Sequence, residues 1–122
     1  GAFEAAGMDL EDLGLGETHD CFTIAELMQY EAMGLTAPGR GAEAALEGWT
    51  RKNGRLPVNA SGGLKAKGHP IGATGVSMHA LVAMQLCGEA GEMQVPGASV
   101  GGVFNMGGAG VATYCSVLEA HH

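Results

Sequence analysis

The chain has 122 residues and a formal net charge of −7 at pH 7, and 46% of its residues are apolar. This composition suits one folded domain and excludes a disordered chain, and the acidic balance argues against nucleic acid as a partner. No apolar run approaches the roughly 20 residues that cross a bilayer, so we expect no membrane span. Three cysteines without metal-ligand spacing predict neither a disulfide framework nor a metal site, and they favour a reducing, cytoplasmic location.

The first part of the chain predicts two helices separated by a short strand. Residues 2–6 have the pattern of a helix that ends at a glycine, and because the sequence begins inside this helix we expect the chain to be part of a longer protein. A turn and a short strand then lead to His19. A second helix begins at Thr23, where Thr23 and Glu26 have the spacing of a capping box.

The rest of the chain alternates helical and extended patterns. A third helix is predicted over residues 41–52, with one apolar face made of Ala42, Ala45, Leu46 and Trp49. The helix predicted over residues 75–90 is apolar nearly all round, which is typical of a helix buried on more than one side. Residues 98–106 and 110–118 are rich in β-branched residues and predict two strands joined by a glycine turn. This order of elements predicts an α/β fold.

The glycine-rich stretch GGLKAKGHPIGATG, residues 62–75, could bind phosphate or present a histidine for acid–base chemistry. Its glycine spacing matches neither the Walker loop nor the dinucleotide fingerprint, which disfavours phosphate. Five of the six basic residues fall within residues 51–67, and a solvated loop accounts for them better than an anion-binding patch.

His69 is the residue of this stretch with the clearest chemical potential. Pro70 restricts His69 to extended geometry, and the helix that follows places its positive end near the imidazole, which favours a neutral ring. On spacing alone, a structural role remains the better interpretation of any single histidine.

Three motifs together resemble one family. The stretch NASGGLKAKGHPIGATG, residues 59–75, resembles the thiolase C-terminal signature of Asn, Gly-Gly and Gly-His-Pro-x-Gly-x-x-Gly. HDCF at residues 19–22 is similar to the loop where most thiolases carry Asn-Glu-Ala-Phe, and FNMGGAG at residues 104–110 is similar to their final Cys-x-Gly-Gly hairpin. The resemblance implies that residues 1–122 form a thiolase C-terminal half-domain, with a mixed sheet, helices on both faces and one deeply buried helix. The N-terminal half, which carries the nucleophilic cysteine, would lie outside this chain.

The resemblance also implies roles for individual residues. His69 matches the histidine that activates the nucleophile and serves one oxyanion hole. Gly107 matches the glycine whose N–H completes the second hole. Phe22 matches an apolar residue of the acyl pocket, and Asn105 stands, at the substrate-binding hairpin, where standard thiolases carry the acid–base cysteine.

The HDCF loop departs from the common pattern in a way that resembles sterol-carrier-protein-type thiolases. There Cys21 would take over proton transfer, and His19 would join His69 in the oxyanion hole. Three further residues match no family motif and are expected to be core residues: His79, Cys87 and Cys115.

The function implied by the resemblance is acyl transfer on a coenzyme A thioester, by thiolysis or condensation, with no bound cofactor and no metal. The implied partners are the acyl-CoA substrate, the N-terminal thiolase half and a second copy in a homodimer or higher oligomer. Two alternatives stay open: a thiolase-like aldolase that works with a partner protein, and a non-catalytic thiolase-fold subunit.

Overall fold

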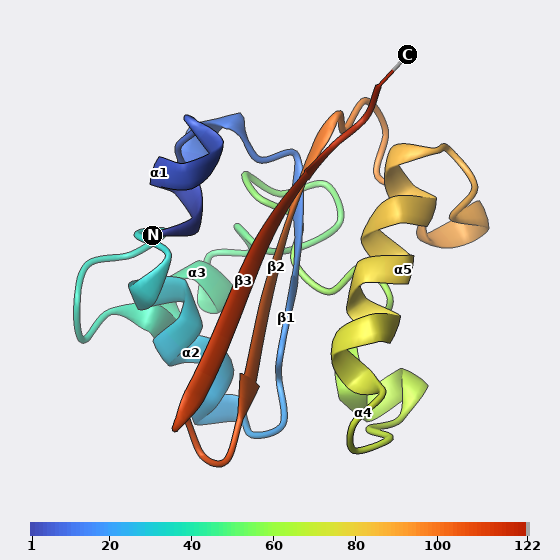
Figure 1. Cartoon of the computed structure of the whole chain (residues 1–122). Coiled ribbons are helices and arrows are strands. Elements are labelled where there is room, and N and C mark those ends of the chain that lie inside the picture. The colour runs from blue at the N-terminus through green and yellow to red at the C-terminus, as the bar shows by residue number, and fades with distance from the viewer. Residues whose placement is uncertain (122) are drawn as a thin grey trace.

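The computed structural model describes residues 1–121, and its centre is a three-stranded mixed sheet (Figure 1). The strand order is β1-β2-β3, with β1 parallel to β2 and β3 antiparallel to it. Val58 adds an isolated parallel bridge to Gly16 beyond β1. The predicted mixed sheet is therefore confirmed, and its strands are β1 (Leu15–Thr18), β2 (Val100–Gly107) and β3 (Ala112–Glu119).

Helices cover both faces of the sheet, as predicted. In Figure 1, the helices α1, α2 and α3 lie on one side and α4 and α5 on the other. Two short 3-10 turns, Leu10–Asp12 and Gly91–Met93, precede β1 and β2. The helices are α1 (Ala2–Ala6), α2 (Thr23–Ala32), α3 (Gly41–Leu46), α4 (Gly63–Lys67) and α5 (Thr74–Leu86).

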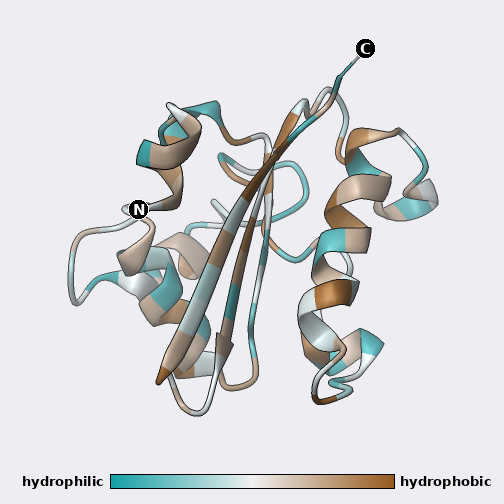
Figure 2. Cartoon of the chain, in the orientation of Figure 1, coloured by the Kyte–Doolittle hydropathy of each residue, from teal (hydrophilic) through white to brown (hydrophobic). Residues whose placement is uncertain are grey.

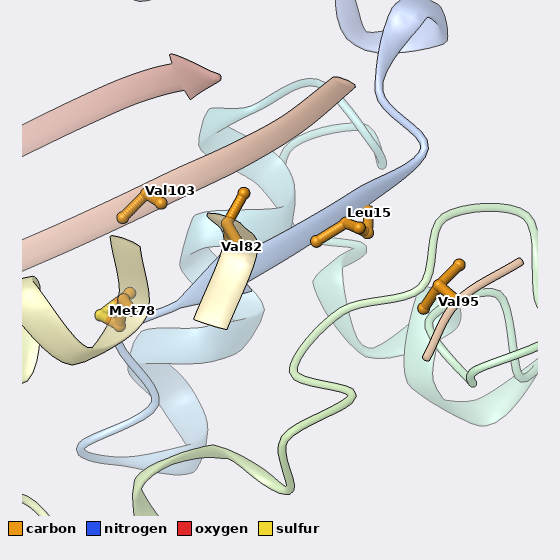
Figure 3. Packing of buried hydrophobic residues seen from close by; sticks show 5 residues of the cluster. All are labelled: Leu15, Met78, Val82, Val95 and Val103. Carbon is orange, nitrogen blue, oxygen red and sulfur yellow. The ribbon is translucent and has the colours of Figure 1, made fainter. Parts of the chain in front are cut away.

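Two apolar clusters hold these layers together. The first lies between the sheet and α5 (Figure 3) and contains Leu15, Met78, Val82, Val95 and Val103. The second joins the loop around Val58 to α2 and α3 and contains Tyr30, Leu35, Ala44, Leu56 and Val58. The strands contribute Leu15 and Val103 to the first cluster, whereas the second cluster is built from helices and loops.

Helix α5 is buried on one face and open on the other. Met78 and Val82 are both 0% exposed, while Val76 is 72% exposed. Figure 2 shows apolar segments along this helix. Some of them are exposed, so the apolar pattern predicted more burial than the helix has in this chain. Within residues 1–121, nothing covers the outer face that carries Val76.

Three local predictions are wrong. The N-cap of α2 is Phe22, whose backbone is extended and whose side chain makes no capping bond, so Thr23 and Glu26 form no capping box. Helix α3 ends at Leu46 and not at residue 52. It buries Gly41 and Ala44, so Leu46, which was expected on the buried face, is 83% exposed. Finally, two of the expected core residues, Cys87 and Cys115, are exposed.

A glycine in β2 sets how closely α5 approaches the sheet. A Cβ at Gly101 would overlap the Val82 side chain, whereas a Cβ at Gly107 would meet no atom within 4 Å. We predict that Gly101→Ala lowers the free energy of unfolding by about 1–3 kcal/mol, and that the control Gly107→Ala changes it by less than about 0.5 kcal/mol. Urea unfolding followed by circular dichroism checks both values, and equal effects would contradict this account of the packing.

Candidate active site

The fold brings the HDCF loop and the glycine-rich loop together at one end of the sheet. His19 follows β1, and its backbone N–H lies 3.0 Å from the carbonyl oxygen of Phe104 and 2.9 Å from Oε1 of Gln29. The ring of His69 comes from the other loop. The two imidazole centroids are 4.9 Å apart, and the ring planes are nearly perpendicular at 86°.

All six predicted site residues line one hollow of about 890 Å³: His19, Cys21, Phe22, His69, Asn105 and Gly107. The His19 side chain is buried, Cys21 is half-buried and Phe22 is 70% exposed. Another cavity, of about 420 Å³ and mostly apolar, lies beside α1 and contains none of the six. The structure therefore gathers the predicted residues, and their individual roles stay predictions.

Acidic side chains at the end of β1 hold the glycine-rich loop in place. Oδ1 of Asp20 accepts a hydrogen bond from the backbone N–H of Leu64 at 2.9 Å. A Cβ at Gly63 would overlap the Asp20 carboxylate, and Gly63 has a φ of +68°, so only glycine fits there. Within β1 itself, Oε2 of Glu17 accepts a hydrogen bond from the Ser61 hydroxyl at 3.0 Å.

Asn59, just before the glycine-rich loop, is hydrogen-bonded to Thr18 of β1. Its backbone has a φ of 52°, a left-handed conformation that asparagine tolerates better than most residues. Its Oδ1 accepts from the backbone N–H of Thr18 at 2.8 Å, and its Nδ2 donates to Oγ1 of Thr18 at 3.0 Å. The asparagine of the signature motif thus has a structural task that sequence reasoning did not assign.

Each histidine of the hollow has a protein partner at Nδ1. Nδ1 of His19 lies 2.8 Å from Oδ1 of Asn105, and Nδ1 of His69 lies 2.7 Å from Oγ1 of Thr74. Thr74 was missed from the sequence, where it stands as the threonine of GATG without a distinguishing signal. The third histidine, His79, is half-buried, and both its ring nitrogens are hydrogen-bonded, as expected of a satisfied structural residue.

Comparison with known proteins places the chain in a family. The sequence model described as "Thiolase C-terminal domain-like" matches residues 1–120. The chain belongs to this thiolase family.

Curated thiolase relatives include the acetyl-CoA acetyltransferase of Methanothermobacter thermautotrophicus, which is 49% identical over 89% of this chain and 28% of its own length. Human sterol carrier protein 2 is 46% identical over 86% of this chain and 19% of its own length. The solved structure of the Ltp2-ChsH2(DUF35) aldolase superposes with a TM-score of 0.84 at 26% identity, over 98% of this chain and 30% of that one. The chain thus spans less than a third of the length of each of these proteins.

Residues 1–121 contain neither a membrane-spanning helix nor a candidate metal site. None of the helices described is both long and apolar enough to cross a bilayer. Within the same residues, no group of three or more His, Cys, Asp or Glu side chains could hold a metal ion.

Glu17 gives the stability of the site region a pH dependence. Burial raises the pKa of its carboxyl above the ordinary 4.5, against the opposing effects of the Ser61 hydrogen bond and the Lys67 charge. A raised folded-state pKa stabilises the fold at acidic pH, and this stabilisation is lost as the pH rises through the folded pKa. We predict that the variant Glu17→Gln does not lose this stabilisation as the pH rises. Its free energy of unfolding relative to that of the wild type should therefore increase with pH.

Urea unfolding at pH values near 4.5 and near 8 checks this prediction. The matched control is Glu89→Gln, which removes one carboxylate at an exposed position. Parallel pH curves for wild type and Glu17→Gln would contradict the assigned cause.

Proposed function

We propose that this chain supplies the acid–base and oxyanion-hole half of a thiolase-type acyltransferase site that acts on coenzyme A thioesters. The observation that carries the proposal is the meeting of His19 and His69, with ring centroids 4.9 Å apart, in a hollow that also contains Cys21. The names of the acetyltransferase and sterol carrier protein relatives support it. The coenzyme A thioester is the substrate, and the proposal requires no bound cofactor.

The first chemical step needs a cysteine from the N-terminal half. Its thiol passes a proton to His69, and the resulting thiolate attacks the thioester carbonyl. The acyl group moves to the cysteine sulfur, and the coenzyme A thiolate leaves and takes up a proton. The negative charge on the carbonyl oxygen during attack requires preorganised donors, a role proposed for the two histidines.

The second step forms or breaks the carbon–carbon bond. In condensation, Cys21 removes an α-proton from the second thioester, and the carbanion attacks the acyl-enzyme carbonyl. Thiolysis is the reverse. The backbone N–H of Gly107 would hold the enolate oxygen, while Phe22 and Asn105 would border the substrate. Ile71, which is 92% exposed, adds apolar surface to the same hollow.

A thiolase-like aldolase is the second candidate, favoured by one observation. The solved structure with a TM-score of 0.84 is that of an aldolase. Such an enzyme would cleave the carbon–carbon bond without forming an acyl-enzyme. Mass spectrometry of the complete protein after incubation with acetoacetyl-CoA separates the two candidates, because only the acyltransferase gains a covalent acetyl group. The presence of His19, Cys21 and His69 in one hollow counts against a non-catalytic subunit.

The assembly and location belong to the same proposal. We infer that the N-terminal half, in a homodimer or higher oligomer, covers the outer face of α5, because Val76 would otherwise stay in water. A reducing, cytoplasmic location is supported by three free cysteines, Cys21, Cys87 and Cys115.

The role of His69 can be tested by its removal from the complete protein. We predict that His69→Ala slows formation of the acyl-enzyme as well as the overall reaction, since one imidazole activates the thiol and holds an oxyanion. The loss of an oxyanion donor alone costs about 10²–10³ in rate. Quenched-flow mass spectrometry measures acylation, with the exposed His121→Ala as the control. Acylation at the wild-type rate in His69→Ala would refute the assignment.

The role of Cys21 predicts a different pattern. Its thiol comes from the loop just before the N-terminus of α2, and Cys21 lines the hollow. We predict that Cys21→Ala retains acyl transfer to the nucleophile and nearly abolishes exchange of the α-protons of acetyl-CoA with deuterated water. The control Cys87→Ala removes an exposed cysteine that does not line the hollow. Deuterium exchange at the wild-type rate in Cys21→Ala would show that another group is the base.

A further inference from the structure

The hydrogen bonds behind the two histidines fix where each ring carries its proton. We propose that Asn105 and Thr74 are positioning residues that hold His19 and His69 as Nδ1–H tautomers, so that each ring becomes an oxyanion donor only after Nε2 accepts a proton. The tautomers follow from the geometry alone, and their use in an oxyanion hole rests on the proposed acyltransferase function.

The first part of the argument is the partner of His19. Oδ1 of Asn105 lies 2.8 Å from Nδ1 of His19. A carboxamide oxygen can only accept a hydrogen bond, so Nδ1 must carry the proton. A neutral imidazole then has an unprotonated Nε2.

The Asn105 amide packs closely against α5 on its other side. Asn105 lies on β2 and faces the first turn of α5, where a Cβ at Gly75 would come within 2.5 Å of its Nδ2. Gly75 therefore leaves the space that the amide occupies between α5 and His19. Any larger residue at position 75 would push Asn105 and displace the His19 ring.

The backbone and ring of His19 are fixed from several directions, while Nε2 stays accessible. Gln29 accepts from the His19 backbone N–H at 2.9 Å and donates to its carbonyl oxygen at 2.8 Å. The residue is only 6% exposed. Nevertheless, across residues 1–121 the sole buried side-chain polar atom without a partner is Oγ1 of Thr36. Nε2 of His19, which also has no partner among those residues, is therefore reached by solvent from the hollow.

His69 has the same arrangement through a hydroxyl group. Oγ1 of Thr74 donates to the carbonyl oxygen of Pro70 at 3.1 Å, which uses its only proton. The same oxygen lies 2.7 Å from Nδ1 of His69, and while its proton is directed at Pro70 it accepts there. His69 is thus also an Nδ1–H tautomer, and its Nε2 has no partner within the part of the chain that the structure describes.

Two neutral histidines of this kind present two lone pairs to the hollow, and lone pairs repel an oxyanion. Transfer of the nucleophile's thiol proton to Nε2 of His69 gives a thiolate and an imidazolium that can donate from Nε2. In the same way, a proton from the Cys21 thiol to Nε2 of His19 leaves a Cys21 thiolate and a second imidazolium. Charge-assisted donors are roughly twice as strong as neutral ones. Proton transfer would therefore create the oxyanion hole at the moment when it produces the thiolate.

The tautomers can be read directly in the complete protein. Magic-angle-spinning ¹⁵N spectra of histidine-labelled protein, recorded well above the ordinary histidine pKa of about 6.5, distinguish protonated from unprotonated ring nitrogens. Signals that vanish in His19→Gln and His69→Gln identify the two rings. We expect a protonated Nδ1 and an unprotonated Nε2 for both.

Matched variants test the cause. Asn105→Leu and Thr74→Val remove the acceptors and should turn the spectra of His19 and His69, respectively, into tautomer mixtures. Asn105→Asp and Thr74→Ser keep the acceptors and should keep the Nδ1–H signals. An Nε2–H signal from either ring in neutral wild-type protein would overturn the proposal, and so would an unchanged spectrum in Asn105→Leu or Thr74→Val. If a variant does not fold, the wild-type spectrum still decides.

This experiment separates the tautomer proposal from the proposed function. The spectra require no turnover, so the absence of an acyl-enzyme in the mass-spectrometric assay would refute the acyltransferase and leave the tautomers standing. Conversely, an acyl-enzyme together with Nε2–H histidines would support the acyltransferase and refute the proton-dependent hole.

Discussion

The tie between the end of β1 and the glycine-rich loop is the constraint on which the geometry of the hollow depends. Asp20 accepts from the backbone of Leu64, and the Ser61 hydroxyl donates to Glu17. Together with the Asn59–Thr18 hydrogen bonds, these bonds join two loops that are far apart in the sequence. The 4.9 Å separation of the imidazoles follows from that connection. This arrangement buries the Glu17 carboxyl group, and because burial disfavours the charged form, the pKa of Glu17 is raised.

Glycines of the glycine-rich stretch and of β2 allow close packing as well as turns. Gly63 makes room for the Asp20 carboxylate, Gly75 for the Asn105 amide and Gly101 for Val82 of α5. In each case a methyl group would collide with a side chain that reaches across from another element. A glycine-rich loop of this kind suits a site built from several layers, because backbones must approach one another before side chains can meet. This requirement explains the spacing better than a phosphate cradle does.

The periodicity of the sequence was sufficient for an α/β order of elements, because alternation and helical spacing are local signals, whereas the mixed sheet with helices on both faces came from the family resemblance. The periodicity did not predict the length or the buried face of α3, and the capping-box spacing did not predict the N-cap residue of α2. In α3 the buried face is set by tertiary packing: Gly41 lies against Leu27 of α2, and Ala44 packs in the second apolar cluster. The meeting of His19 with His69 came from the family resemblance and not from spacing. The partners Thr74 and Asn59 were not predicted at all, since ordinary Thr and Asn residues carry no sequence signal of what they will bond.

The exchange of residues between the hairpin and the HDCF loop has a consistent physical logic. A carboxamide at position 105 does not titrate in a useful range, so it cannot move protons, but it can hold a neighbouring ring with a definite polarity. A thiol at position 21 can titrate, and it sits on the loop whose histidine that carboxamide holds. Under the proposed function, the proton-moving group and the fixed dipole have changed places relative to the common thiolase pattern. On this proposal, the site keeps one proton donor–acceptor beside the substrate, and it gains an additional imidazole whose tautomer is set by its hydrogen bond to Asn105.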